Sequence, residues 1–265
     1  MIPKIADLNL QIQHDIRPKE PACKQRTRQW KPNTESFSAM FSRQEDGFKN
    51  VSLGNVLSAA SPSEKITFLS DADIVLFKEW RGKSFEVQVA IHELLGHGSG
   101  KLLKEVEGGV LNFDAESVKH PITGGKVETW YKEGETWDAK FGAMSSSYEE
   151  CRAECVGIYL CTVPSILSLF GHTCGDGEVV DVIYGNWLIM VRAGLLALEF
   201  YTPSTKQWRQ AHMQARYCIL KVLLEAGQGL VSITGKGAEA VVSLDRSKIL
   251  TVTPQPLYPL PLLAS

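Results

Sequence analysis

Residues 84–97 read Ser-Phe-Glu-Val-Gln-Val-Ala-Ile-His-Glu-Leu-Leu-Gly-His, an apolar segment of helical character that ends in two histidines. A zinc peptidase helix normally carries H-E-x-x-H, in which histidines four residues apart share one face and the glutamate lies beside the metal. Here His97 comes five residues after His92. On a regular helix the two rings would then point about 140° apart and could not reach one metal.

The extra residue between the histidines predicts an irregular helix. The segment must unwind or form a π-bulge if both rings are to reach one metal. Gly96 lies where the backbone distorts most easily, directly before the second histidine. Taken alone, the six residues fit two unrelated histidines near a helix end as well as they fit a metal site.

A second group of polar residues lies at Tyr148-Glu149-Glu150-Cys151-Arg152-Ala153-Glu154. Two histidines and one carboxylate form a common catalytic zinc site that leaves one position open for water. Glu150 and Glu154 share a helix face, so one can bind the metal while the other orients a ligating histidine. The alternative is a solvated acidic helix start. Apolar neighbours argue against a simple surface helix: Cys151, Ala153, Val156 and Ile158.

Outside these two motifs the sequence pattern is largely helical. We predict helices over about 145–161, 178–200 and 204–227. Ser146 with Glu149, or Ser147 with Glu150, has the spacing of a capping box at the start of the first of these. A glycine-rich excursion with short strands is expected over 108–140, and a small hairpin over 230–244.

The two ends of the chain differ from the middle. Residues 1–45 form a divergent, basic segment that we expect to be disordered or poorly packed, and 251–265 form a proline-rich tail. A solvated tail is the simpler interpretation of the basic run, with nucleic-acid or membrane binding as the alternative. That run contains Arg17, Lys19, Lys24, Arg26, Arg28 and Lys31.

The composition is that of a folded chain without strong charge. Among 265 residues, 28 Lys+Arg against 30 Asp+Glu give a net charge of −2, which excludes a globally basic nucleic-acid binder. No apolar run approaches the ~20 residues of a membrane helix, and the N-terminus has no signal-peptide core. The six cysteines form no C-x-x-C pair. We therefore expect reduced thiols and a cytoplasmic protein.

The two motifs together resemble the M49 family of zinc exopeptidases, the dipeptidyl peptidase III family. Its two signatures are H-E-L-L-G-H and E-E-C-R-A-E, which match His92–His97 and Glu149–Glu154. The resemblance covers about Gly47 to Ile249 and implies a mainly α fold, namely a partial helical catalytic lobe with a small β-hairpin and irregular loops. Residues 46–250 would then be a partial zinc-peptidase catalytic domain. Other similar stretches are Gly47–Leu57, Gly134–Asp138, Arg192–Tyr201, Trp208–Arg216 and Leu244–Ile249.

The resemblance also implies one zinc ion and assigns its ligands. His92, His97 and Glu150 match the family's zinc ligands. Glu93 matches the general base that activates water at the metal, in keeping with the role of a carboxylate beside zinc.

Four further residues receive roles from the resemblance. Glu149 and Glu154 match carboxylates around the ligating histidines. His212 matches a histidine that faces the substrate and stabilises the transition state, as a hydrogen-bond donor can. Arg216 lies one turn later on the same helix and is a possible substrate-binding residue.

Part of the family pattern is missing. Family members are more than twice as long, and a second lobe holds the amino terminus of the peptide and pairs with its backbone. In some mammalian members a loop carries Glu-Thr-Gly-Glu and binds a Kelch-type adaptor. Here the corresponding loop reads Ile122-Thr123-Gly124-Gly125 and lacks both glutamates, so we expect no binding to that adaptor.

The function implied by the resemblance is release of N-terminal dipeptides from oligopeptides by zinc-dependent hydrolysis. We expect oligopeptide substrates and no nucleic-acid or membrane partner. Two other classes remain open. One is a zinc-binding fragment that cannot position substrate, and the other is an interaction protein that uses the basic N-terminal segment.

Overall fold

The structure is a computed structural model that describes residues 65–98, 102–120, 124–173, 177–226 and 228–252. The expected N-terminal segment, the stretch Gly47–Leu57 and residues 253–265 of the proline-rich tail lie outside the described residues, as does part of the loop at 121–125. The first two residues of that tail, Thr251 and Val252, belong to α10. The longer helices are α4 (Asp71–Ile91), α6 (Ser145–Leu160), α8 (Gly177–Leu196) and α9 (Ala211–Ala226), and the shorter ones are α5 (Trp137–Phe141), α7 (Pro164–Leu169) and α10 (Ile249–Val252).

Short strands and single turns complete the described chain. The strand pairs are antiparallel: β1 (Glu105–Val106) with β2 (Val110–Leu111), β3 (Tyr201–Thr202) with β4 (Gln207–Trp208), and β5 (Val231–Thr234) with β6 (Val241–Leu244). A π-helix, η1 (His92–His97), continues α4. The 3-10 turns are η2 (Glu107–Gly109), η3 (Gly142–Met144), η4 (Ala197–Phe200), η5 (Gly237–Glu239) and η6 (Arg246–Lys248). The fold is therefore mainly α, as predicted.

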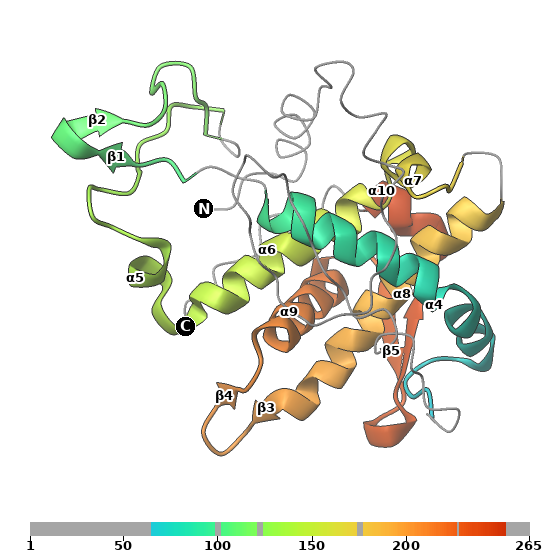
Figure 1. Cartoon of the computed structure of the whole chain (residues 1–265). Helices are drawn as coiled ribbons and strands as arrows, with labels where there is room; N and C mark the ends of the chain where they lie inside the picture. The colour runs from blue at the N-terminus through green and yellow to red at the C-terminus, as the bar shows by residue number, and fades with distance from the viewer. Residues whose placement is uncertain (1–64, 99–101, 121–123, 174–176, 227, 253–265) are drawn as a thin grey trace, which may run out of the picture.

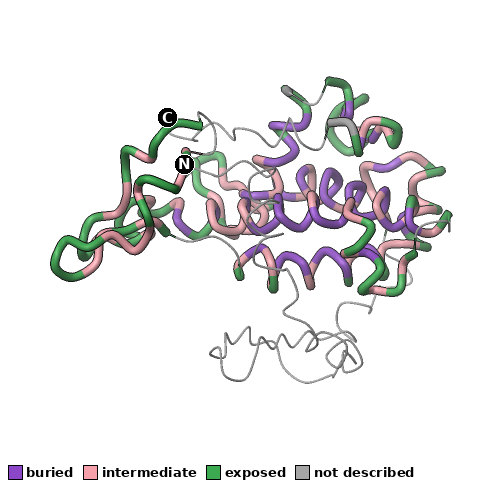
Figure 2. Tube along the Cα trace, turned by 90° about the horizontal axis from the view of Figure 1, so that it is seen from above, coloured by how far each residue is buried: buried purple, intermediate pink, exposed green. Residues whose placement is uncertain are grey.

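Four helices enclose the core. Helices α4, α6, α8 and α9 pack against one another (Figure 1). On α8, Trp187 and Leu188 are completely buried. Figure 2 shows that buried positions gather on these helices, while the arm that carries β1 and β2 is largely exposed.

Close helix contacts depend on glycines. A Cβ at Gly194 on α8 would lie 2.5 Å from Leu220 Cβ and 2.9 Å from Arg216 O on α9. A Cβ at Gly96 on η1 would lie 2.9 Å from both Cα and Cβ of Ala153 on α6. Atoms cannot approach so closely, so these glycines set the spacing between the helices.

Helix α8 has a property that we did not expect from the sequence. With η4 it forms a helical stretch, Gly177–Phe200, that is long and apolar enough to cross a membrane by length and composition. Because 61% of its apolar window is buried inside the protein, its apolar surface serves packing against α4 and α9. A buried core helix passes the same test of length and composition.

The start of α9 was predicted wrongly. The sequence favoured a helix from about residue 204, but β3 and β4 form a hairpin there and α9 begins at Ala211. The capping box at α6 is also wrong: α6 begins at Ser145 with no side-chain cap, and Ser147 Oγ donates instead to Gln214 Oε1 at 2.7 Å on α9. The hydroxyl of Ser147 thus bonds to a side chain on another helix and does not cap the start of its own helix. The expected arm with short strands, the β5–β6 hairpin and α8 with η4 are confirmed.

Helix α6 carries two buried free thiols, Cys151 and Cys155. Cys161, directly after the end of α6, is also free and buried, and α9 carries the less buried Cys218. Contact with Cys155 and burial raise the pKa of Cys151 well above its usual value. The expectation of reduced thiols fits these four cysteines. Cys23 and Cys174 lie outside the described residues.

Candidate metal centre

The π-helix brings the two motif histidines together. From His92 to His97 the backbone is π-helical, so the predicted irregularity is confirmed. The ring centroids of His92 and His97 are 4.7 Å apart, with the ring planes at 86°. The wider turn therefore removes the angular offset that a regular α-helix would impose.

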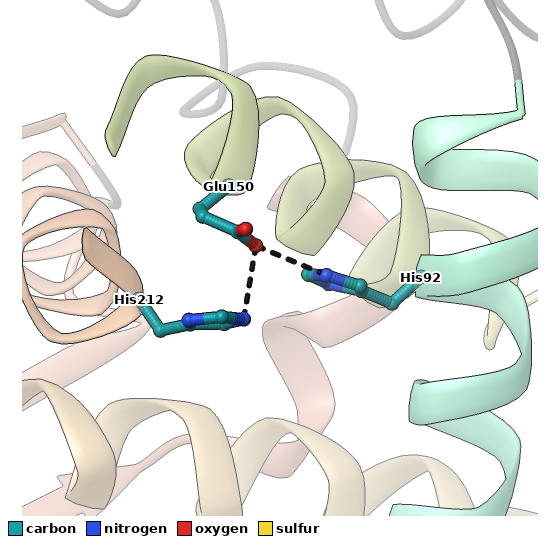
Figure 3. A group of neighbouring side chains, drawn as sticks. All are labelled: His92, Glu150 and His212. Atoms are coloured by element: carbon teal, nitrogen blue, oxygen red, sulfur yellow. Dashed lines mark ion pairs between the residues drawn. The ribbon is translucent and has the colours of Figure 1, made fainter. Parts of the chain in front are cut away.

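Glu150 on α6 is the centre of the group. Its Oε2 atom lies 3.2 Å from His92 Nε2 and 3.5 Å from His97 Nε2. The same oxygen lies 3.1 Å from Nε2 of His212, which approaches from α9 (Figure 3). Three imidazoles from two separate segments thus face one carboxylate oxygen.

The predicted ligands and the geometry differ in one histidine. The ligand atoms of His92, Glu150 and His212 all lie within 4.8 Å of one another, which is close enough to hold a metal ion. The sequence predicts His97 in the place of His212. Because His97 Nε2 also faces Glu150 Oε2, the described residues offer four donors around one point.

Two orphaned atoms support binding of a cation at this point. His92 Nε2 and Glu150 Oε2 are buried, and neither has a hydrogen-bond partner despite their short separation. Buried polar atoms without partners are rare and call for a ligand, water or ion. Imidazole nitrogen and carboxylate oxygen are typical zinc ligands, so the residues present fit a zinc ion.

Carboxylates control the charge of the two motif histidines. Burial lowers the pKa of His92, but contacts with Glu150 and Glu154 outweigh it and raise the pKa to about 9. Contacts with Glu149 and Glu150 raise the pKa of His97 to about 9. Burial opposes ionisation of Glu150, yet His92 and His97 hold its pKa well below the usual range. Without a metal, protons therefore occupy this site at neutral pH.

Glu154 orients His92 from behind. This carboxylate is 1% exposed, and its Oε2 atom lies 3.4 Å from His92 Nδ1. Arg216 Nε donates to Oε1 at 2.7 Å, and Gln88 Nε2 donates to Oε2 at 2.8 Å. A metal-ligating histidine typically has such a carboxylate on its other nitrogen. Arg216, predicted as a possible substrate-binding residue, is engaged by Glu154.

Glu149 contacts Nδ1 of His97 in the same way as Glu154 contacts Nδ1 of His92. Its Oε1 atom lies 3.0 Å from His97 Nδ1, and Arg152 Nε donates to its Oε2 at 2.8 Å. Glu93 lies half-buried on η1, directly after His92.

Two glutamines of the site carry no sequence signal that we recognised. Gln88 precedes His92 by four residues on the same helix face, and that spacing could have identified it. Its amide fits against Gly157, where a Cβ would lie 2.4 Å from Gln88 Nε2. The other glutamine is Gln210, whose Nε2 atom lies 3.2 Å from His212 Nδ1. Its place directly before a helix start was hidden because the start of α9 was predicted too early.

Comparisons with known proteins agree on one family. A sequence profile of Peptidase family M49 matches residues 37–258. Dipeptidyl peptidase 3 of Homo sapiens is 60% identical over 217 residues, and that of Rattus norvegicus is 59% identical over 217; each alignment covers 79% of this chain and 29% of the relative. Dipeptidyl peptidase 3 of Dictyostelium discoideum is 50% identical over 214 residues, which is 78% of this chain and 30% of that protein. The chain therefore spans under a third of the length of these curated relatives.

One solved structure is a more distant match. A structure of DPP III from Caldithrix abyssi aligns with 72% of this chain and 30% of that chain, at 18% sequence identity and a TM-score of 0.40.

Proposed function

Because the chain belongs to peptidase family M49, we propose that it holds the zinc-binding catalytic region of a dipeptidyl peptidase, which releases dipeptides from the N-terminus of oligopeptides. The observation that carries this proposal is the convergence of His92, His97 and His212 on Glu150 Oε2. Residues 46–250 would form this region.

We assign the metal to His92, His97 and Glu150. Both histidines have a carboxylate on Nδ1, which leaves Nε2 to face Glu150. When bound, zinc would polarise the peptide carbonyl and lower the pKa of water. The chain's own residues then supply orientation and proton transfer.

Two residues act on the substrate in this proposal. Glu93, one position after His92, takes the proton from the attacking water and passes it towards the leaving amine. His212 approaches from α9 and is partly exposed, so it can reach a bound peptide and donate to the developing oxyanion. Burial lowers the pKa of His212, and a neutral imidazole can still donate from one nitrogen.

Metal content of purified variants tests the ligand assignment. We expect about one zinc per chain in the wild type, retention in His212→Ala, and loss in His97→Ala. His172→Ala, which lies outside the site, is the control for the loss of a histidine. Equal zinc in His97→Ala and the wild type would refute the assignment, and loss in His212→Ala alone would favour the other set of three.

A dipeptidyl-arylamide assay tests the reaction. We expect Glu93→Gln to keep its zinc and to lose turnover, since the variant removes the base and leaves the ligands. A zinc-binding fragment without activity remains the second candidate, because the chain covers only 29% of the human relative. Zinc without turnover in the wild type would favour that candidate, and neither zinc nor turnover would favour an interaction protein.

A further inference from the structure

Gln210 lies at the junction of β4 and α9 and makes two contacts with its side-chain amide. Its Oε1 atom accepts the backbone N–H of Met213 at 2.7 Å. Its Nε2 atom lies 3.2 Å from His212 Nδ1. Because an N–H must meet an oxygen, the Met213 contact fixes which way the amide points, and the NH₂ group must be the one that faces His212.

This orientation determines where His212 carries its proton. A neutral imidazole has one N–H and one nitrogen lone pair. The amide NH₂ of Gln210 can only donate, so Nδ1 of His212 must accept and holds the lone pair. The proton is then on Nε2, the atom that lies 3.1 Å from the Glu150 carboxylate.

The other two histidines of the site have the opposite arrangement. Nδ1 of His92 faces Glu154, and Nδ1 of His97 faces Glu149. Carboxylates only accept, so Nδ1 is the nitrogen that keeps its proton when either ring is neutral, and Nε2 then offers its lone pair to a metal. The three histidines around Glu150 thus differ in the partner of Nδ1, which is a carboxylate for His92 and His97 and an amide for His212.

We propose that Gln210 is a positioning residue that holds His212 in the Nε2–H tautomer, which makes His212 a hydrogen-bond donor to the substrate and prevents it from serving as a zinc ligand. The proposal rests on the proposed function for the use made of that donor. The tautomer itself is a property of the chain and can be measured without turnover.

Long-range ¹H–¹⁵N correlation spectra of histidine-labelled protein, recorded with and without zinc, report which ring nitrogen carries the proton. The chain has six histidines, so the His212 signals can be assigned by comparison with His212→Ala. We expect Nε2–H for His212 in both wild-type samples. A zinc ligand bound through Nε2 would carry its proton on Nδ1, so Nδ1–H in the zinc-loaded wild type would overturn the proposal.

Two variants separate the tautomer from helix capping. In Gln210→Glu one oxygen can still cap Met213 while the other presents an acceptor to His212, so the proton of the neutral ring should move from Nε2 to Nδ1. Gln210→Ser keeps a short cap and removes the amide, so the Nδ1–H form should become detectable. Gln207→Glu, an exposed site on β4, is the matched control and should leave the spectrum unchanged. An unchanged His212 signal in both Gln210 variants would refute the proposal.

Kinetics of the zinc-loaded protein give a second readout. Loss of an oxyanion donor costs about 10²–10³ in kcat, so Gln210→Glu should lower kcat about 100-fold with zinc content and KM near the wild-type values. If the wild type binds no zinc and yet shows Nε2–H at His212, the proposed function fails and the tautomer assignment stands. If zinc and turnover are present while Gln210→Glu retains full kcat, the positioning role fails alone.

Discussion

Glu154 shows how one residue can control a whole site. A buried carboxylate is costly unless it is paired and hydrogen-bonded. Glu154 meets this requirement with Arg216 on α9, Gln88 on α4 and His92 at the start of η1. The ion pair and hydrogen bonds that stabilise its charge also tie three helical segments to one point, so the ring orientation of His92 is linked to the packing of the core.

The contact between Gln88 and Gly157 can be tested by a double-mutant cycle. Gly157→Ala should destabilise the protein by about 1–3 kcal/mol, because its Cβ would lie 2.4 Å from Gln88 Nε2. In a Gln88→Ala background the same substitution should cost under about 1 kcal/mol, since the space is empty. Urea denaturation measures both values. Additive effects would show that the two side chains do not meet.

The raised pKa values of His92 and His97 predict how stability of the metal-free chain depends on pH. Both values rise from 6.5 to about 9 on folding. A raised pKa stabilises the folded state fully below the unfolded value, and this stabilisation is lost as the pH rises through the folded value. The melting temperature in chelator should therefore fall between about pH 6.5 and 9. His97→Ala should show a shallower fall, and an identical slope in that variant would contradict the prediction.

At the scale of elements, the helix contacts that build the site depend on small residues. Gly194 lets α8 approach α9, and Gly96 lets η1 approach α6. The first contact fixes the helix that carries His212 and Arg216, and the second fixes the segment that carries His97. Because these two glycines have no side chain, the helices approach closely, and their spacing determines the distances between the polar groups.

Two glycine-to-alanine substitutions should act in opposite directions. Gly194→Ala places a methyl 2.9 Å from a backbone oxygen of α9 and should destabilise the protein by about 1–3 kcal/mol. Gly82→Ala, on the exposed side of α4 with nothing within 4 Å, should stabilise it by up to about 1 kcal/mol through helix propensity. Thermal unfolding distinguishes them. Equal effects would mean that α8 and α9 have room to separate.

The sequence predicted those elements whose cause is local. The π-helix follows from the spacing of His92 and His97, and the end of α6 follows from Pro164. The start of α9 and the role of Ser147 could not be predicted, because both depend on partners far away in the chain. Gln88 and Gln210 were missed for the same reason: an amide has a role here only through its neighbours.

At the scale of the whole molecule, the activity of these residues depends on what holds the peptide. They contain the proposed ligands, the base and the donor, all on or beside the helical core. From the family resemblance we expect the group that holds the peptide's amino terminus to lie in a second lobe. The chain covers 29% of its human relative.

We expect this chain to be a poor dipeptidyl peptidase even when it is loaded with zinc. Proximity and orientation can account for about 7–11 kcal/mol of a barrier, and the resemblance implies that a second lobe supplies them by holding the peptide. Its kcat/KM on a dipeptidyl-arylamide should fall far below that of a full-length relative assayed beside it. Comparable values would show that these 265 residues already contain the substrate site.

The thiols buried on α6 offer a way to observe opening of this region. Cys151 and Cys155 directly follow Glu150 and Glu154, and their side chains are shielded in the folded protein. An alkylating reagent can reach them only when the helix leaves its neighbours, so the labelling rate reports local opening. Mass spectrometry of the labelled peptides would then show whether a bound cation keeps α6 packed against its neighbours, and Cys161, directly after the end of that helix, provides an internal comparison.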